Sequence, residues 1–371
     1  MYAVLFTATG LSAAEISSLF IVWSVTAFAA ELPSGVLADL FSRRLLVALG
    51  PLVTALGFAL WVVVPSYPAF AAGFVLWGIG GALVSGALEA LVYEELDRAG
   101  AGASYARVTG RAAAVRTTAY MVATAVAAPV LAAGGYPALG AASVAALLVA
   151  AAIGWSFPES RERVRRGGDA KISGEGGGDD EETTAGSYLR VLREGLAEVR
   201  ASASVRRALV YLAVLMGVTS VDEYLPLLAL DTGVGEAAVP LVILLFTAGD
   251  AVGGWSAGRG GRWEAAALAV AAVCLAAGAL VGTTAAMVLV AAAFGVFRWA
   301  IAAAEARLQD RIGDDSRATV SSMAGFASEV AAVGAYASYG LGSAWAGPGP
   351  LFAVAAAPYL LLALARRFGR Y

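Results

Sequence analysis

Apolar runs of about 20 residues alternate with short turns along most of the chain. A helix of that length crosses roughly 30 Å of hydrocarbon, so each run predicts a transmembrane helix. The connections at 64–68 and 134–137 hold proline and glycine, and they are too short for soluble domains. The complete spans that the pattern predicts are 14–38, 45–65, 68–92, 107–133, 136–157, 206–230, 237–257, 263–283, 284–308, 317–343 and 349–367.

The first ten residues are apolar but reach only about half of a membrane-spanning length. A helix that began at Met1 would place the α-amino group near the bilayer centre, where a charge is costly. We therefore expect that helix 1 is truncated here and that its first part precedes Tyr2. The stretch does not resemble a signal peptide, because no basic segment precedes it and no small-residue cleavage site follows.

Composition and charge sharpen this picture. The chain is 60% hydrophobic and 14% charged, which is unlike a soluble enzyme. Of its 25 lysines and arginines, all but Arg116 and Arg298 lie in or beside the loops on one side of the predicted membrane. This positive-inside pattern predicts a multi-pass protein of the inner or plasma membrane. The N-terminus of the full-length chain, the central loop and the C-terminus are expected in the cytoplasm.

The long polar segment 158–205 divides the spans into two sets of six, if the incomplete first helix is counted. We predict an all-α fold with two six-helix bundles, 1–157 and 206–371, related by a pseudo-two-fold axis. The intervening 158–205 is predicted to be a cytoplasmic linker. Within it, apolar residues recur at helical spacing over 188–199, which indicates an amphipathic helix at the membrane surface.

A motif with its own chemistry follows the span 14–38. The run at 35–44 begins with Gly35, places Asp39 near the start of the next helix and ends with Arg43 and Arg44. An acid is favourable at a helix N-terminus, and an arginine pair can hold a carboxylate or a lipid phosphate. This run resembles the G-x-L-A-D-x-x-x-R-[RK] signature of the major facilitator superfamily.

The second half repeats this motif in a degraded form. Gly254, Arg259 and Arg262 occupy the matching loop, with Gly258 in the place of Asp39. Parallel repeats of this kind are a transporter architecture. The resemblance implies a central substrate cavity and rocker-type alternating access. We expect Asp39 and Arg43 to form a gate by pairing with the cytoplasmic ends of helices 4 and 11. These are the spans 68–92 and 317–343 when the incomplete first helix is counted as helix 1. The alternative is that these arginines serve only to set the topology.

Charged residues inside the spans are the remaining candidates, because each costs at least ~2.5–3.5 kcal/mol at mid-membrane unless it has a partner or a cavity. Four acids near the cytoplasmic ends are expected to pair or gate. Arg298 and Glu329 are plausible partners as a structural ion pair, an interpretation as favoured as proton coupling. Adjacent residues on a helix point about 100° apart, so Asp222 and Glu223 cannot both face one partner. The full set is Glu31, Glu89, Asp250 and Glu305 near the ends, and Arg116, Asp222, Glu223, Arg298 and Glu329 deeper.

The chain has no histidine, so a proton-coupled cycle would have to use a buried carboxylate. Asp222, Glu223 and Glu329 are the candidates. Acids outnumber arginines in the deep set, which favours a cationic or amphiphilic cargo. Aromatic side chains that would wall such a cavity, or would simply pack, are Tyr120, Tyr224, Trp299, Tyr336 and Tyr339.

We therefore expect a secondary active transporter, with proton-coupled export of a small amphiphilic or cationic compound as the leading hypothesis. The alternative is a proton-coupled uptake permease for a small nutrient. A membrane sensor or an intramembrane enzyme is less favoured, since the sequence shows no Ser/His pair, no phosphate-binding loop and no metal-ligand cluster. No cofactor, ATP site or nucleic-acid partner is expected. One departure from drug–proton antiporters is Phe74, which stands where they usually carry an arginine.

Overall fold

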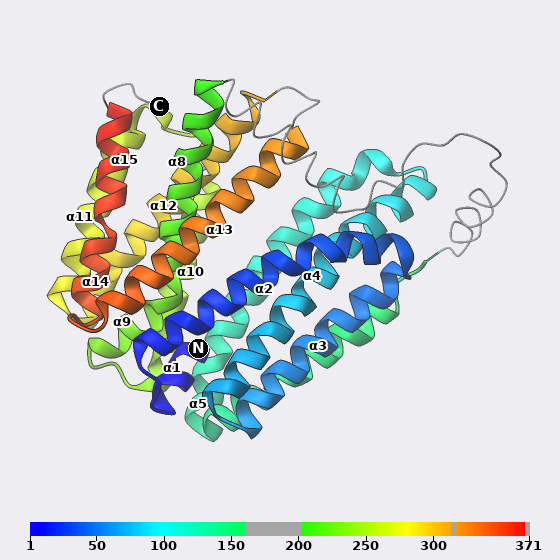
Figure 1. Ribbon diagram of the computed structural model, residues 1–371, viewed down its shortest axis with the longest axis horizontal. Helices are drawn as coiled ribbons and strands as arrows, with labels where there is room; N and C mark the ends of the chain where they lie inside the picture. The colour runs from blue at the N-terminus through cyan, green and yellow to red at the C-terminus, as the bar shows by residue number, and fades with distance from the viewer. Residues whose placement is uncertain (160–201, 313–316, 368–371) are drawn as a thin grey trace.

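The computed structural model describes residues 1–159, 202–312 and 317–367. The described chain is helical, and it forms two groups of helices that lie side by side and diverge toward one end (Figure 1). We call the group before residue 160 the N-terminal half and the group after residue 201 the C-terminal half. The predicted amphipathic helix at 188–199 lies outside the described residues, and the predicted domain boundaries remain predictions.

The N-terminal half contains four long helices and a short first one. The short helix ends at a turn with Gly10 in the left-handed region, where glycine carries no steric cost. A capping box between Ser12 and Glu15 then begins the next helix. The elements are α1 Tyr2–Ala8, α2 Ala13–Leu40, α3 Arg43–Val63, α4 Tyr67–Arg98, η1 Gly102–Ser104 and α5 Tyr105–Trp155.

The last helix of this half, α5, contains two of the predicted spans. Gly135 has a φ of 63°, which breaks the helix at the Gly-Gly-Tyr-Pro turn that the sequence placed at 134–137. The chain therefore reverses there, and the spans 107–133 and 136–157 form the two arms of a tight turn.

The C-terminal half follows the same plan. Its first long segment is interrupted by a 3₁₀ turn that carries two of the deep acids, Asp222 and Glu223. The elements are α8 Ala203–Thr219, η2 Ser220–Tyr224, α9 Leu225–Asp231, η3 Glu236–Ala238, α10 Val239–Trp255, η4 Gly261–Trp263, α11 Glu264–Val281, η5 Thr284–Ala286, α12 Met287–Gln309, α13 Arg317–Gly342, α14 Pro348–Ala355 and α15 Ala357–Arg367.

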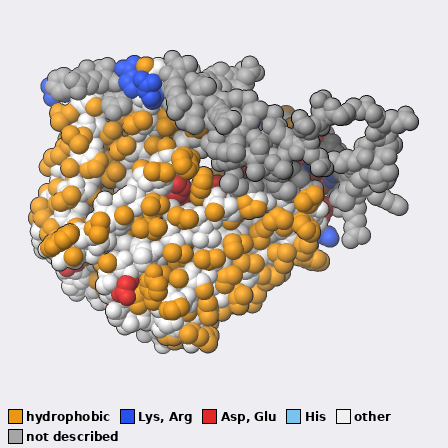
Figure 2. Space-filling view, viewed as in Figure 1, with side chains coloured by type: hydrophobic (Ala, Val, Ile, Leu, Met, Phe, Trp, Pro, Cys, Tyr) orange, Lys and Arg blue, Asp and Glu red, His pale blue; other side chains and the backbone are white. Residues whose placement is uncertain are grey.

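The outer surface suits a lipid environment. Apolar side chains cover most of the face in Figure 2, and large ones such as Val63 and Leu341 are more than two-thirds exposed. By length and composition, nine stretches of the described chain can cross a membrane. The sequence predicts eleven complete spans. Nine are found here because the two arms of α5 are counted as one stretch and α13 is not among the nine. These helices confirm a polytopic all-α membrane protein.

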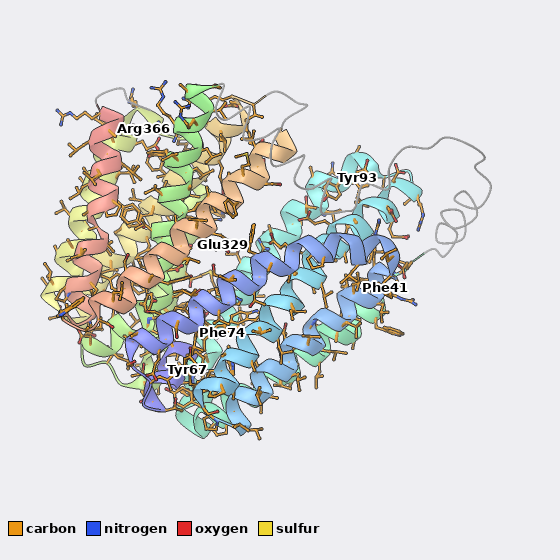
Figure 3. All side chains as sticks on the ribbon, viewed as in Figure 1. Phe41, Tyr67, Phe74, Tyr93, Glu329 and Arg366 are labelled. Carbon is orange, nitrogen blue, oxygen red and sulfur yellow. The ribbon has the colours of Figure 1, made fainter. Side chains whose placement is uncertain are left out.

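The two ends of the molecule differ in charge. Arg43 begins α3, Arg98 ends α4, and Arg366 lies in the last turn of α15, so the alternation of helices brings all three to one end. We call this end the arginine end; Arg366 marks it in Figure 3, and Tyr67 marks the opposite end. Exposed tryptophans lie at both ends, Trp255 and Trp263 at the arginine end and Trp345 at the other, as in an interfacial aromatic belt.

Small residues allow α10 and α12 to approach closely. A Cβ added at Gly253 would lie 2.0 Å from the carbonyl oxygen of Gly295, and one added at Gly249 would lie 2.6 Å from that of Ala291. Because hydrophobic burial contributes little between helices in lipid, contacts of this kind provide much of the association energy.

The adjacent glycines 253 and 254 give a matched test of this packing. Gly253→Ala is expected to destabilise the protein by about 1–3 kcal/mol, because the new methyl group overlaps a backbone carbonyl. Gly254→Ala, where nothing lies within 4 Å of the added Cβ, is expected to leave the melting temperature unchanged or slightly raised. Thermal unfolding in detergent measures both, and equal melting temperatures for the two variants would contradict the packing argument.

Candidate functional site

A cavity of about 700 Å³ lies between the two halves. Its walls come from α2, α8, η2 and α13, which are far apart in the sequence. The lining residues are Ala27, Phe28, Glu31, Met216, Ser220, Ser321, Ser322, Gly325, Phe326, Ser328, Glu329 and Ala332. Glu329 lies where α13 faces α2 in Figure 3, and Figure 2 shows red carboxylate atoms near the centre of a mostly apolar face, with a second red group lower on the left.

One face of α2 supplies a regular stripe to this cavity. Ser24, Phe28 and Glu31 recur at helical spacing, so their side chains share one face of the helix. The opposing stripe of α13 contains Phe326 and Glu329. The Ser24 hydroxyl donates a hydrogen bond to Glu329 Oε2 at 2.7 Å, and the rings of Phe28 and Phe326 have centroids 5.3 Å apart. These contacts join the two halves.

A smaller chamber of about 210 Å³ adjoins the main cavity. Asp222 and Glu223, which belong to the 3₁₀ turn η2, both line it. The Tyr2 hydroxyl donates a hydrogen bond to Glu223 from the other half. The lining residues of the chamber are Trp23, Ser24, Ala27, Ser220, Asp222, Glu223, Glu329 and Tyr336.

Beyond the chamber, the halves are closed at the end opposite the arginines. The buried Tyr224 hydroxyl donates to Ser17 Oγ at 2.7 Å, and the Tyr136 hydroxyl donates to Glu236 Oε2 at 2.8 Å. The backbones also approach closely there, since a Cβ on Gly340 would lie 2.8 Å from the Ser17 Cβ. The cavity therefore lies on the arginine side of a closed contact between the halves.

The arginine end of the N-terminal half is tied together by an ion pair. Arg43 lies 2.5 Å from Glu94 of α4. The Ser42 hydroxyl and the Arg43 backbone N–H both donate to Glu159, which follows the last helix of this half. Arg44 lies over the ring of Trp155. These contacts join the start of α3 to the ends of α4 and α5 within one half.

The C-terminal half has a corresponding cluster with the opposite signs. Glu264, the first residue of α11, is fully buried. Arg307 binds it through two hydrogen bonds of 2.7 and 2.8 Å, Arg366 lies 2.8 Å away, and the Tyr211 hydroxyl donates at 2.7 Å. Both guanidinium groups also lie over the Tyr211 ring. In this half an acid, Glu264, meets arginines at the ends of α12 and α15. In the N-terminal half an arginine, Arg43, meets acids at the corresponding helix ends.

This architecture can be compared with known proteins. The family model described as Major Facilitator Superfamily matches residues 1–336. The chain belongs to this family. It is a transporter rather than an enzyme, and no curated protein matches it significantly.

Solved transporters share the fold of this facilitator. It is similar to the crystal structure of a D-xylose–proton symporter, with a TM-score of 0.67 and 15% identity over 97% of this chain and 89% of that one. The nucleoside transporter NupG has a TM-score of 0.69 and 13% identity, over 99% of this chain and 93% of that one. For the POT family transporter PepTSo the corresponding values are 0.65 and 12%, over 96% and 89%. At these identities the likeness shows the fold alone.

The structure brings together four of the acids predicted from the sequence and separates the others. Glu31, Asp222, Glu223 and Glu329 line the two connected spaces. Asp250 instead interacts electrostatically with Arg298. Exposed residues that line neither space are Glu89, Arg116, Gly254, Arg259, Arg262 and Glu305.

One of the sequence interpretations needs correction. The predicted pair of Arg298 and Glu329 is not among the ion pairs of the described residues, because Arg298 packs beside Gly253 of α10 while Glu329 faces Ser24. Asp222 and Glu223 both line the small chamber, and the Tyr2 hydroxyl donates to Glu223. The expectation that the two acids do not share one partner stays a prediction.

The aromatic candidates divide in a similar way. Tyr336 lines the small chamber, and Tyr120 is exposed. Tyr224 and Tyr339 are buried and stacked, with centroids 3.6 Å apart, and they line neither of the two described spaces. Trp299 donates to the Arg259 carbonyl at 2.9 Å and so holds a loop in place.

Three further residues remain. Two belong to the loop motif, and the third departs from the family pattern. Gly35 and Asp39 belong to α2, but the surroundings of Gly35 and of the Asp39 side chain lie outside what the structure describes. Phe74, at the position where antiporters usually carry an arginine, is fully buried and contacts the rings of Phe6, Phe20 and Trp77. An aromatic cluster therefore fills that site, as the label in Figure 3 locates it.

Sequence reasoning missed Glu264. The signal was available: an acid at the first position of one helix and arginines in the last turns of two others must all lie at the same end. What the sequence could not supply was which helices are neighbours in space.

Glu264→Gln is expected to destabilise the transporter by about 3 kcal/mol, because it leaves two arginines facing each other around a neutral group. The measurement is thermal unfolding in detergent. Glu95→Gln is the matched control, since Glu95 forms an exposed pair with Arg98 one turn away, and such pairs contribute about 0–1 kcal/mol. The account fails if the two variants lose the same amount of stability.

Proposed function

We propose that this transporter exports a small cationic or amphiphilic compound in exchange for protons. The observation that carries the proposal is the content of the cavity walls. Four carboxylates, from Glu31, Asp222, Glu223 and Glu329, line the two connected spaces, and no arginine or lysine is among their lining residues. Such a site attracts positive charge, because acids in a poorly solvated space need either a proton or a cation for neutralisation.

The same chemistry favours exchange over co-transport. A proton and a cationic cargo neutralise the same carboxylates, so binding of one opposes binding of the other. In a membrane with an inward proton gradient, this competition drives the cation outward. Glu329 is the central group in the proposal, because it lines both spaces and also accepts a hydrogen bond from the opposite half.

We further propose that the arginine end faces the cytoplasm, which is the orientation that the positive-inside rule predicts. The described state is then open to the inside. The interactions that Arg43 makes with Glu94 and Glu159 lie within one half, so they do not oppose this opening. On closure, Asp39 and Arg43 are proposed to meet the cytoplasmic end of α13, the predicted span 317–343. Glu89, Glu305, Arg259 and Arg262 are proposed to lie near the closing surfaces.

The alternative is uptake of a small nutrient together with protons. A specific observation favours keeping it: one of the structures with this fold is a D-xylose–proton symporter. Serines at positions 220, 321, 322 and 328 line the cavity, and hydroxyls can bind a neutral polar cargo. Vesicles of known orientation decide between the two, since an antiporter accumulates a lipophilic cation in inverted vesicles energised with acid inside, and a symporter does not.

Glu329→Gln is expected to reduce proton-driven transport of a lipophilic cation by at least about tenfold, because the amide cannot carry the charge that the proton and the cargo share. Glu223→Gln is expected to have a similar effect. Transport is measured in inverted vesicles with an imposed pH gradient, at equal protein content. Glu95→Gln, an acid outside the cavity, is the control, and full activity in both cavity variants would reject the assignment.

Asp39→Ala tests the proposed gate. If Asp39 helps to close the arginine end, transport is expected to fall while the amount of protein in the membrane stays the same. Transport and surface expression are measured on the same cells. Unchanged transport would leave the motif with only a topological role.

A further inference from the structure

The two carboxylates of the main cavity come from opposite halves, Glu31 from α2 and Glu329 from α13. Ser24 and Glu31 are seven residues apart on α2, which is about 10 Å along the helix axis and close to two full turns. Glu329 is held at the level of Ser24 by their hydrogen bond. The carboxyl group of Glu329 therefore lies at the Ser24 level, while the Glu31 side chain branches from α2 about two helical turns further along the same cavity, and the two acids interact electrostatically.

Between these two levels the cavity wall is apolar. Phe28 of α2 and Phe326 of α13 contact each other across the halves, with ring centroids 5.3 Å apart, and Ala27 lies beside them. The two levels themselves are polar: Ser24 and Ser220 accompany Glu329, and Ser321 and Ser322 are among the lining residues on the α13 segment near Glu31. The order along the cavity is thus acidic, aromatic and acidic.

We propose that the cargo is an elongated dication, with two ammonium groups separated by an apolar spacer of about 10 Å. One ammonium group binds Glu329 and the hydroxyls beside it. The spacer lies against Phe28 and Phe326, and the second ammonium group binds Glu31. A linear diamine or polyamine, or an apolar chain with a basic group at each end, has this shape. The inference rests on the proposed function, since it specifies the cation that the same cavity carries.

The geometry assigns different tasks to the four acids. Glu31 lines only the main cavity, and Asp222 and Glu223 line only the smaller chamber. The smaller chamber has room for several water molecules, at about 30 Å³ each. Glu31 and Glu329 bind either the cargo or protons, which keeps the two in competition, while Asp222 and Glu223, which line only the smaller chamber, take protons.

The test is a binding series on the purified, full-length transporter in lipid nanodiscs. The probes are α,ω-diamines of increasing chain length, from diaminoethane to diaminododecane, each compared with the monoamine of the same carbon number. Isothermal titration measures the dissociation constants. Affinity is expected to peak at the diamine whose nitrogens are about 10 Å apart, and to exceed that of its monoamine by about tenfold or more.

Two variants separate this proposal from general cation binding. Glu31→Gln is expected to abolish the advantage of the diamine while monoamine affinity stays the same. Phe28→Ser, which keeps both acids, is expected to weaken the long diamines and to remove the length optimum. Gel filtration and thermal unfolding confirm that both variants are folded, and Glu95→Gln is the control that alters neither series.

Each result bears on a separate claim. Monoamines that bind as tightly as diamines, or an affinity that rises steadily with chain length, would overturn the dication proposal and leave cation transport standing. If neither series binds to the folded protein, both the dication proposal and the proposed cationic cargo are wrong.

Discussion

The cost of an uncompensated charge in hydrocarbon governs the arrangement of this molecule. Water is absent from the bilayer core, so an ionised side chain there needs a partner, a cavity or a proton. The first two of these solutions are found in different places in this molecule. Glu264 is fully buried and bound by two arginines and a tyrosine, whereas Glu31 is exposed in a cavity. The ion pairs of Arg43 with Glu94 and of Arg307 with Glu264 hold each half together, and the carboxylates of Glu31 and Glu329 line the space between the halves.

The ion-pair clusters also show how a repeated fold can keep its geometry while its chemistry changes. Arg43 begins α3 and meets partners at the ends of α4 and α5. Glu264 begins α11, which has the corresponding place in the other half, and meets partners at the ends of α12 and α15. Their charges are opposite. What the two halves share is therefore the need to neutralise the same junction of three helix ends, and either sign satisfies that need if the partners change with it.

Much of the fold is predictable because membrane helices are set by length and hydropathy. The predicted span 14–38 lies within Ala13–Leu40, and the turn predicted at 134–137 contains the break at Gly135. The candidate site was predictable only in part. Acids at positions 31, 222, 223 and 329 stand out because charge is rare in such spans. The partner of Arg298 and the role of Trp299 depend on which helices are neighbours, and the sequence of one chain does not contain that information.

The closed end of the cavity is held by interactions of a different kind from those within each half. Tyr224 with Ser17, Ser24 with Glu329 and Tyr136 with Glu236 are single hydrogen bonds from hydroxyl groups, each contributing about 0.5–3 kcal/mol. An alternating-access cycle needs two arrangements separated by only a few kcal/mol. The single hydrogen bonds between the halves can break at low cost, while the ion-pair clusters keep each half intact as it moves. Together they meet that requirement. Because Ser24 donates to Glu329, a cation or proton that reaches this carboxylate competes directly with a contact that holds the halves closed. Binding and closure therefore depend on the same oxygen atoms, which gives the proposed exchange a physical route from the cargo to the movement of the halves.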